Sequence, residues 1–246
     1  MDAIVKFANQ SQGRDRIFRT TQYACTLSIY LLRKNTERND LVSKLKSLEA
    51  TMNSGRKLLR LGNTITSIEA AKRTMQLSDR VLCLCLTVAN INRAVYFLCD
   101  NVVWARNVGL INNIDKERWS LNASRCYFFS LVMNLTRDIY AILLLMVQRG
   151  RDRRFRQKMD QQLHNNPEVA DVVIPQLDAF LFLLLESLRS HPDVALDVLK
   201  NTCDLFIPLH KLGIYQTHAG VVGFCGLISS LIGIVTLVQP KLKIKP

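Results

Sequence analysis

Near its C-terminus the chain carries a long apolar segment that is typical of a membrane helix. Gly220 to Val238 reads GVVGFCGLISSLIGIVTLV, 19 residues without an ionisable side chain, and Lys211 and Lys241 flank it. As a helix it is about 29 Å long at ~1.5 Å per residue, close to the thickness of a bilayer's hydrocarbon core. The alternative, a buried helix of a soluble protein, is usually shorter and rarely so free of charge. We therefore predict a transmembrane span at about residues 219–239.

Small residues recur along this segment at intervals of three or four. They are Gly220, Gly223, Gly226, Ser230 and Gly233. Such spacing lets two helix backbones approach closely in lipid, which predicts packing on a sister helix or on a second copy of the chain. The alternative is composition alone, since glycine is frequent in membrane helices.

The distribution of proline predicts an all-α fold. All six prolines lie at Pro167 or later, and the first 166 residues contain only five glycines. Long helices are therefore left uninterrupted over most of the chain. We expect a multi-helix, membrane-associated bundle with long N-terminal amphipathic helices and a C-terminal transmembrane helix.

Positive charge is concentrated in two regions. The chain carries a net charge of +13; residues 1–80 hold 15 Lys/Arg against 7 Asp/Glu, a net of +8, and residues 148–163 hold 6 against 2, a net of +4. This asymmetry indicates an acidic partner. With a membrane span in the same chain, we expect an anionic phospholipid surface and no nucleic acid, because no nucleic-acid-binding signature is present.

Catalytic and metal-binding patterns are missing from the sequence. The seven cysteines are scattered through apolar runs, and the four histidines share no helix-face spacing with them. No phosphate-binding glycine loop, nucleophile elbow or HExxH motif occurs. We expect no enzyme activity, no metal and no cofactor.

Apolar and charged stretches divide the chain into four parts. Residues 1–80 are expected to form a basic, cytosolic region of amphipathic helices. Residues 81–147 form an apolar helical region with a possible first crossing near 81–104, and residues 148–166 a basic flexible linker. Residues 167–246 contain the C-terminal helices, the span and a short basic cytosolic tail.

An amphipathic helix is predicted after the Gly62–Asn63 break. Ile65, Ile68 and Met75 share one face, and basic residues border it. Such a helix could lie in the headgroup plane of a membrane, or it could be a half-buried helix of a bundle.

Several blocks of the sequence resemble the peroxin-eleven family of peroxisomal membrane proteins, with the closest match to the vertebrate alpha form. The resemblance covers essentially the whole chain. The blocks are SGRKLLRLGN at 54–63, NRAVYFLCDNVVW at 92–104, MNLTRDIY at 133–140, CDLFIPLHKLGIY at 203–215 and GVVGFCGLISS at 220–230.

The resemblance implies a multi-pass protein of the peroxisomal membrane with both termini cytosolic. Such a protein elongates the membrane into tubules before fission, so the implied partners are itself, related family members, fission adaptors and a dynamin-related GTPase. Termini on one side require an even number of crossings, which favours 81–104 as the second span. Alpha-type relatives also carry a KxKxx tail linked to coatomer; here the tail is KLKIKP, so coatomer is a doubtful partner.

The family's amphipathic helix inserts into anionic lipid and curves the membrane, and the resemblance places this function between Arg56 and Arg80. The membrane-inserting face would then comprise Leu61, Ile65, Ile68 and Met75. The contacts to anionic headgroups would comprise Arg56, Lys57, Arg60, Lys72 and Arg73.

Four charged residues interrupt the apolar helices: Arg93, Asp100, Arg137 and Asp138. Charges at membrane depth must face other helices or water rather than lipid. Two alternatives follow. They form buried ion pairs that set helix register, or they line the aqueous path of a non-selective channel for small metabolites, an activity also suggested for the family.

Overall fold

The chain is a bundle of helices. The structure is a computed structural model that describes residues 7, 9–33, 38–163, 176–242 and 244, with the side chains of 156–163 and 176–179 left out. All regular elements in these ranges are helical, which confirms the predicted all-α class. The elements are α2 (Ser11–Leu32), α3 (Asn39–Leu59), α4 (Asn63–Thr74), α5 (Arg80–Asn107), α6 (Lys116–Leu163), α7 (Gln176–Ser190), α8 (Pro192–Lys211), α9 (Ala219–Val238) and the short 3₁₀ helix η2 (Pro240–Leu242).

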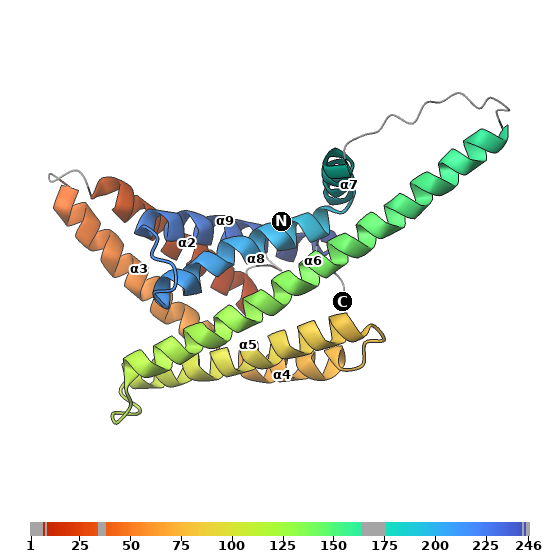
Figure 1. Ribbon diagram of the computed structural model, residues 1–246. Helices are drawn as coiled ribbons and strands as arrows, with labels where there is room; N and C mark the ends of the chain where they lie inside the picture. Colours follow the sequence, from red (N-terminus) through yellow and green to blue (C-terminus); the bar gives the residue numbers. More distant parts are fainter. Residues whose placement is uncertain (1–6, 8, 34–37, 164–175, 243, 245–246) are drawn as a thin grey trace.

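The helices associate in two groups that meet at α6 (Figure 1). One group is the hairpin of α5 and α6, with α4 packed along α5 at the periphery. The other contains α2, α8 and α9: α2 packs on α9 and on α3, and α8 lies between α6 and α9. The predicted transmembrane helix is therefore the neighbour of the first long helix of the chain.

Short polar or glycine-containing turns separate the helices. Gly62 adopts a left-handed conformation with φ of 86°, which ends α3 and starts α4 in a new direction. Asp79 caps α5 by accepting hydrogen bonds from the backbone N–H groups of Val81 and Leu82 at 2.8 and 3.2 Å. The amphipathic segment between residues 56 and 80 is thus divided between the last turn of α3, the whole of α4 and the cap of α5.

The structure of the basic stretch at residues 148–163 differs from the linker predicted from the sequence. A flexible linker was predicted at 148–166, but α6 continues as one helix to Leu163, and Figure 1 shows it projecting beyond the bundle. Arginine, lysine, glutamine and methionine are good helix formers, and no proline interrupts the run. A charge-rich stretch without apolar periodicity can therefore remain helical. Residues 164–166 lie outside the described part.

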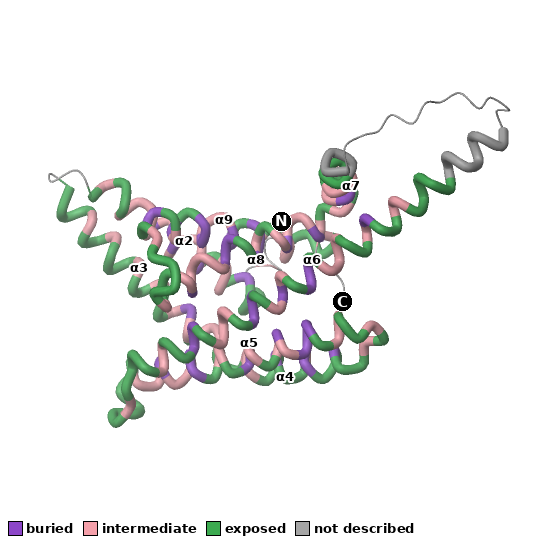
Figure 2. Tube along the Cα trace, viewed as in Figure 1, coloured by how far each residue is buried: buried purple, intermediate pink, exposed green. Residues whose placement is uncertain are grey.

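Large apolar side chains cover much of the outer surface. Buried residues lie mainly where helices meet (Figure 2). Large apolar side chains are exposed on α4, α5, α6 and α9. Among the described residues, three helices are long and apolar enough to cross a membrane: α5, α6 as far as Phe155, and α9. The C-terminal candidate and the one near 81–104 were predicted, and α6 is an additional candidate. An apolar exterior over long helices is the pattern expected of a protein surrounded by lipid.

Candidate membrane-binding site

Helix α4 turns its large apolar residues away from the protein. Its buried residues are Ser67, Ala71 and Thr74, all small, and they face α5. The Thr74 hydroxyl is 3.0 Å from that of Thr87 on α5, so a buried hydrogen bond joins the two helices. A soluble amphipathic helix normally buries its largest apolar side chains, because most of the stabilisation comes from them. In α4 the small residues pack on the protein instead.

All four residues of the predicted membrane-inserting face are exposed: Leu61 in the turn before α4, Ile65 and Ile68 on α4, and Met75 at its C-cap. Leu61, Ile65, Ile68 and Met75 expose 43, 72, 47 and 63% of their surface. Ile68 also lines a shallow, wholly apolar groove with Ile91, Val95 and Leu98 of α5. The apolar surface is therefore continuous from α4 to one side of a helix that can span a membrane.

Two of the five predicted lipid-contacting bases lie on α4. Lys72 is exposed and, in helical projection, lies between Ile65 and Ile68. Arg73 is exposed and pairs with Glu69 one turn earlier. Lys72 is thus the base of α4 that is best placed to reach a headgroup next to the apolar face.

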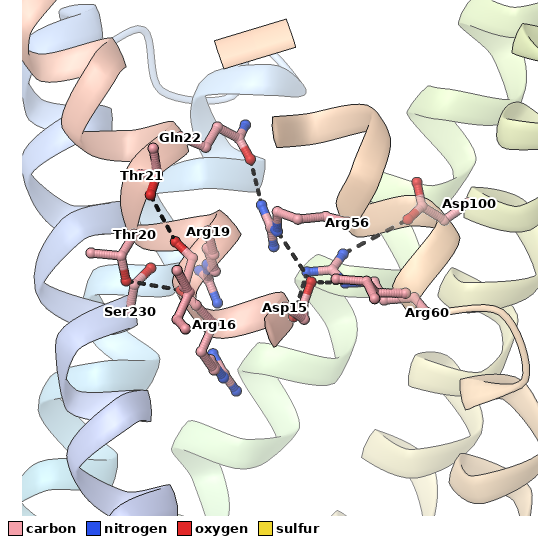
Figure 3. Close-up of polar contacts among 12 residues, drawn as sticks. Asp15, Arg16, Arg19, Thr20, Thr21, Gln22, Arg56, Arg60, Asp100 and Ser230 are labelled. Carbon is pink, nitrogen blue, oxygen red and sulfur yellow. Dashed lines mark hydrogen bonds and ion pairs between the residues drawn. The ribbon is translucent and has the colours of Figure 1, made fainter. Parts of the chain in front are cut away.

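The other three bases, Arg56, Lys57 and Arg60, are largely buried at the end of α3, and Figure 3 shows Arg56 and Arg60. Arg56 is 6% exposed, and its guanidinium reaches Asp15 at 3.2 Å and Gln22 at 2.6 Å. Arg60 contacts Asp15 at 2.9 Å. This placement differs from the prediction of headgroup contacts, because the turn at Gly62 separates these bases from α4 and protein carboxylates hold them.

The ionic cluster around Asp15 links α2, α3 and α5. Arg60 donates to the Tyr96 hydroxyl at 2.7 Å and lies 3.7 Å from Asp100, and Lys57 lies 3.6 Å from Asp100. Burial acts to raise the pKa of Asp15, but the positive charges of Arg60 and Arg56 hold it at about 2. Asp15 therefore stays ionised and holds the end of α3 against α2.

The small-residue face of α9 packs on α2. A Cβ atom built on Gly226 would lie 2.4 Å from the Tyr23 ring, and one on Gly220 2.5 Å from the Tyr30 ring. A Cβ atom built on Gly223 would lie 2.9 Å from the Leu27 backbone nitrogen. Gly233 faces the Arg16 guanidinium, and Ser230 is completely buried. The four glycines among the five predicted packing residues thus lie at one contact with α2, a sister helix of the same chain.

A buried ion pair adjoins this contact. Arg19 of α2 pairs with Asp204 of α8 and donates to the Ser229 hydroxyl of α9 at 3.1 Å. Both charged side chains are less than a tenth exposed. Burial acts to raise the pKa of Asp204, but the charge of Arg19 and the hydrogen bond from Ser229 lower it. Three helices that are far apart in sequence are therefore held together by one charge pair.

The charges within the apolar helices contact other helices of the bundle. Besides Asp100, which faces Lys57 and Arg60, Arg137 lies 2.8 Å from Asp138 and 3.0 Å from Asp197 of α8. Asn201 of α8 donates to Asp138 at 2.6 Å. Arg93 is half-buried and forms no ion pair within the described ranges. Three of the four charges are thus arranged as the ion-pair alternative requires.

The role of α2 was missed in the sequence. Tyr23, Leu27 and Tyr30 are spaced four and three apart, which places them on one helix face, the face that receives the α9 glycines. This spacing was a usable signal, but it does not identify the partner helix. No short-range pattern connects residue 23 with residue 226.

Comparison with known proteins places the chain in a family. The family model for "Peroxisomal biogenesis factor 11 (PEX11)" matches residues 1–238. The chain belongs to the PEX11 family. PEX11 relatives named "Peroxisomal membrane protein 11A" are 48% identical in Rattus norvegicus and 44% identical in Homo sapiens, over 100% of this chain and 99% of theirs. "Peroxisomal membrane protein 11B" of Homo sapiens is 44% identical over 100% of both chains.

These matches confirm the resemblance seen in the sequence blocks, including its alpha-type character. A more distant PEX11 relative, "Peroxisomal membrane protein 11 homolog" of Dictyostelium discoideum, is 26% identical over 95% of this chain and 92% of its own. No solved structure matches the chain. Membership of the PEX11 family, together with three membrane-compatible helices, supports a location and a role in the peroxisomal membrane.

Proposed function

We propose that the protein elongates the peroxisomal membrane by inserting the outer face of α4 into one leaflet. The observation that carries the proposal is the inverted polarity of α4, in which Ser67, Ala71 and Thr74 pack on the protein while Ile65 and Ile68 point outward. A helix inserted at headgroup depth expands one leaflet relative to the other and so favours curvature. Lys72 would hold an acidic headgroup beside the inserted face, contributing on the order of 1 kcal/mol.

The geometry supports insertion in the plane of the membrane. The apolar groove between α4 and α5 continues the exposed face of α4 onto a helix that can span the bilayer. With α5 embedded in lipid, the adjacent α4 would already be held at the membrane surface. It would not have to reach the membrane by diffusion. The orientation with both termini cytosolic, self-association, and recruitment of fission adaptors and a dynamin-related GTPase remain parts of the proposal.

The full-length protein reconstituted in vesicles that contain acidic phospholipid tests this function. Burying an Ile side chain contributes about 1.5–3 kcal/mol, so Ile65→Glu/Ile68→Glu should remove roughly 2–4 kcal/mol of insertion free energy after allowance for their partial exposure. We expect tubules in electron micrographs with the wild type and round vesicles with this variant. Thr66→Glu/Ala70→Glu, which adds the same charge at exposed Thr66 and half-buried Ala70 on the other side of α4 from Ile65 and Ile68, is the control and should still form tubules.

Equal tubulation by both double variants would contradict the proposal. The channel alternative makes a different prediction, because neutralising Asp100 and Arg137 would then change ion conductance across the same vesicles. Both residues pair with charges of neighbouring helices, so we expect those substitutions to lower stability rather than alter conductance.

A further inference from the structure

The junction of α6 and α7 contains a second, separate amphiphilic cavity, which is open on one side. It has a volume of about 400 Å³ and lies between the two helices. Its apolar wall is formed by Leu143, Met146 and Val147 of α6 together with Phe180 of α7, and its rim carries Arg151 and Arg154. An apolar wall beneath two cationic side chains matches the two halves of a phospholipid, whose acyl chains are apolar and whose phosphate is anionic.

The two rim arginines differ from the neighbouring Arg149 and Arg153, which both lie close to a carboxylate of α7. Glu186 of α7 lies 3.8 Å from Arg149 and also pairs with Arg153, whose guanidinium stacks 4.7 Å over the Phe182 ring. These contacts attach α7 to α6. Within the described part of the chain, no carboxylate pairs with Arg151 or Arg154, and both are exposed. The cavity rim therefore carries positive charge that an anion can neutralise.

The surroundings indicate that the anion comes from a membrane. Helix α7 has only 15 residues, too few to span a bilayer, yet Leu181 and Leu185 expose 44 and 66% of their surface. In α6, the apolar stretch that qualifies as a membrane span changes to a basic one at the level of the cavity. Arginines at such a boundary extend toward headgroups while their stems remain in the apolar layer.

We propose that the α6–α7 cavity binds an anionic phospholipid of the surrounding membrane. Arg151 and Arg154 hold its phosphate, and Met146 and Phe180 contact the upper part of its acyl chains. Arginine suits this role because its planar guanidinium can donate two hydrogen bonds to one phosphate. The site is separate from α4, so it does not depend on the proposed elongation mechanism.

Native mass spectrometry of the full-length protein in mild detergent tests the proposal, with phosphatidic acid and phosphatidylcholine of identical chains as probes. We expect the wild type to retain phosphatidic acid preferentially and Arg151→Gln/Arg154→Gln to lose at least tenfold in retention. Arg118→Gln/Arg125→Gln, at the other end of α6, removes the same charge from two exposed arginines and should bind like the wild type. Phe180→Ser, which leaves the charge unchanged, should also weaken retention severalfold.

Each alternative result is informative. Equal losses in the two arginine variants would show that only net charge matters, and unchanged retention by Phe180→Ser would show that the chain does not occupy the cavity. Displacement by millimolar inorganic phosphate alone would indicate a simple anion site. Any of these results overturns the proposal. Circular dichroism of each variant verifies that helix content is preserved, so that loss of lipid is not confused with loss of fold.

Discussion

The contact between α2 and α9 leads to a prediction about Gly226→Ala. In an exposed helix interior, replacing glycine with alanine stabilises by about 1 kcal/mol, because alanine restricts the unfolded backbone. At Gly226 the new methyl would lie 2.4 Å from Cδ1 of Tyr23 and 2.6 Å from its Cε1, well inside the ~3.5–4 Å optimum for carbon atoms. Tyr23 is 8% exposed, so its ring has little room to move.

Overpacking of this kind costs about 1–3 kcal/mol, which exceeds or cancels the gain in helix propensity. We expect a net destabilisation of about 0–2 kcal/mol and a fall in Tm of roughly 0–8 °C for a chain of this size. The matched control is Gly150→Ala in α6, where a new Cβ meets nothing within 4 Å, so its Tm should rise by about 2–4 °C.

Thermal unfolding of the full-length protein in one detergent, followed by circular dichroism, compares the two variants directly. Tyr23→Ala combined with Gly226→Ala should cost less than the sum of the single changes, because the clash is then removed. If Gly226→Ala raised Tm as much as Gly150→Ala, α9 would not pack on α2. Its small-residue face would then be free for another copy of the chain.

Two ion pairs lead to further predictions. Asp204→Ala leaves Arg19 buried without its carboxylate and should lower the unfolding free energy by about 3–5 kcal/mol. Arg19→Met/Asp204→Leu, which removes both charges, should recover most of this loss. A small effect of the single change in chemical denaturation would refute the buried pair. Asp15 has a pKa of about 2 against an ordinary value of 3.8. Its ionised form therefore stabilises the fold by roughly 2 kcal/mol above pH 4, and this stabilisation is lost as the pH falls from 4 to 2. Asp15→Asn should therefore be less stable than the wild type at pH 7 and nearly equal to it at pH 2, and parallel pH–stability curves would contradict the assignment.

Much of the helical architecture could be predicted from local patterns. The C-terminal span, the long helix interrupted by Arg93 and Asp100, and the apolar face of α4 all depend on residues within a few turns of one another. Helix periodicity acts at this range, so the sequence carries a direct signal. The basic stretch at 148–163 was misjudged because the absence of an apolar stripe was treated as the absence of a helix, although its residues have high helix propensity.

The candidate site was only partly predictable, because the sequence does not show which residue a charged side chain pairs with. Arg56 and Lys72 look alike in the sequence, as bases that border one amphipathic stretch. In the structure, Arg56 is buried against Asp15 while Lys72 is exposed. Whether a base is available to lipid depends on carboxylates tens of residues away, which only the packing of α2 against α3 brings within reach.

The sequence by itself determined that the chain is helical and carries segments long and apolar enough to cross a membrane, because these properties follow from composition, period and spacing. Only the tertiary structure decided which helix receives the glycine face of α9, which arginines pair with carboxylates among the described residues, and that α6 and α7 line an open cavity. Those features depend on contacts between residues 33 to 210 positions apart, such as Arg153 with Glu186 and Arg19 with Ser229. Contacts at such separations are set by how whole helices pack, and no local propensity encodes them.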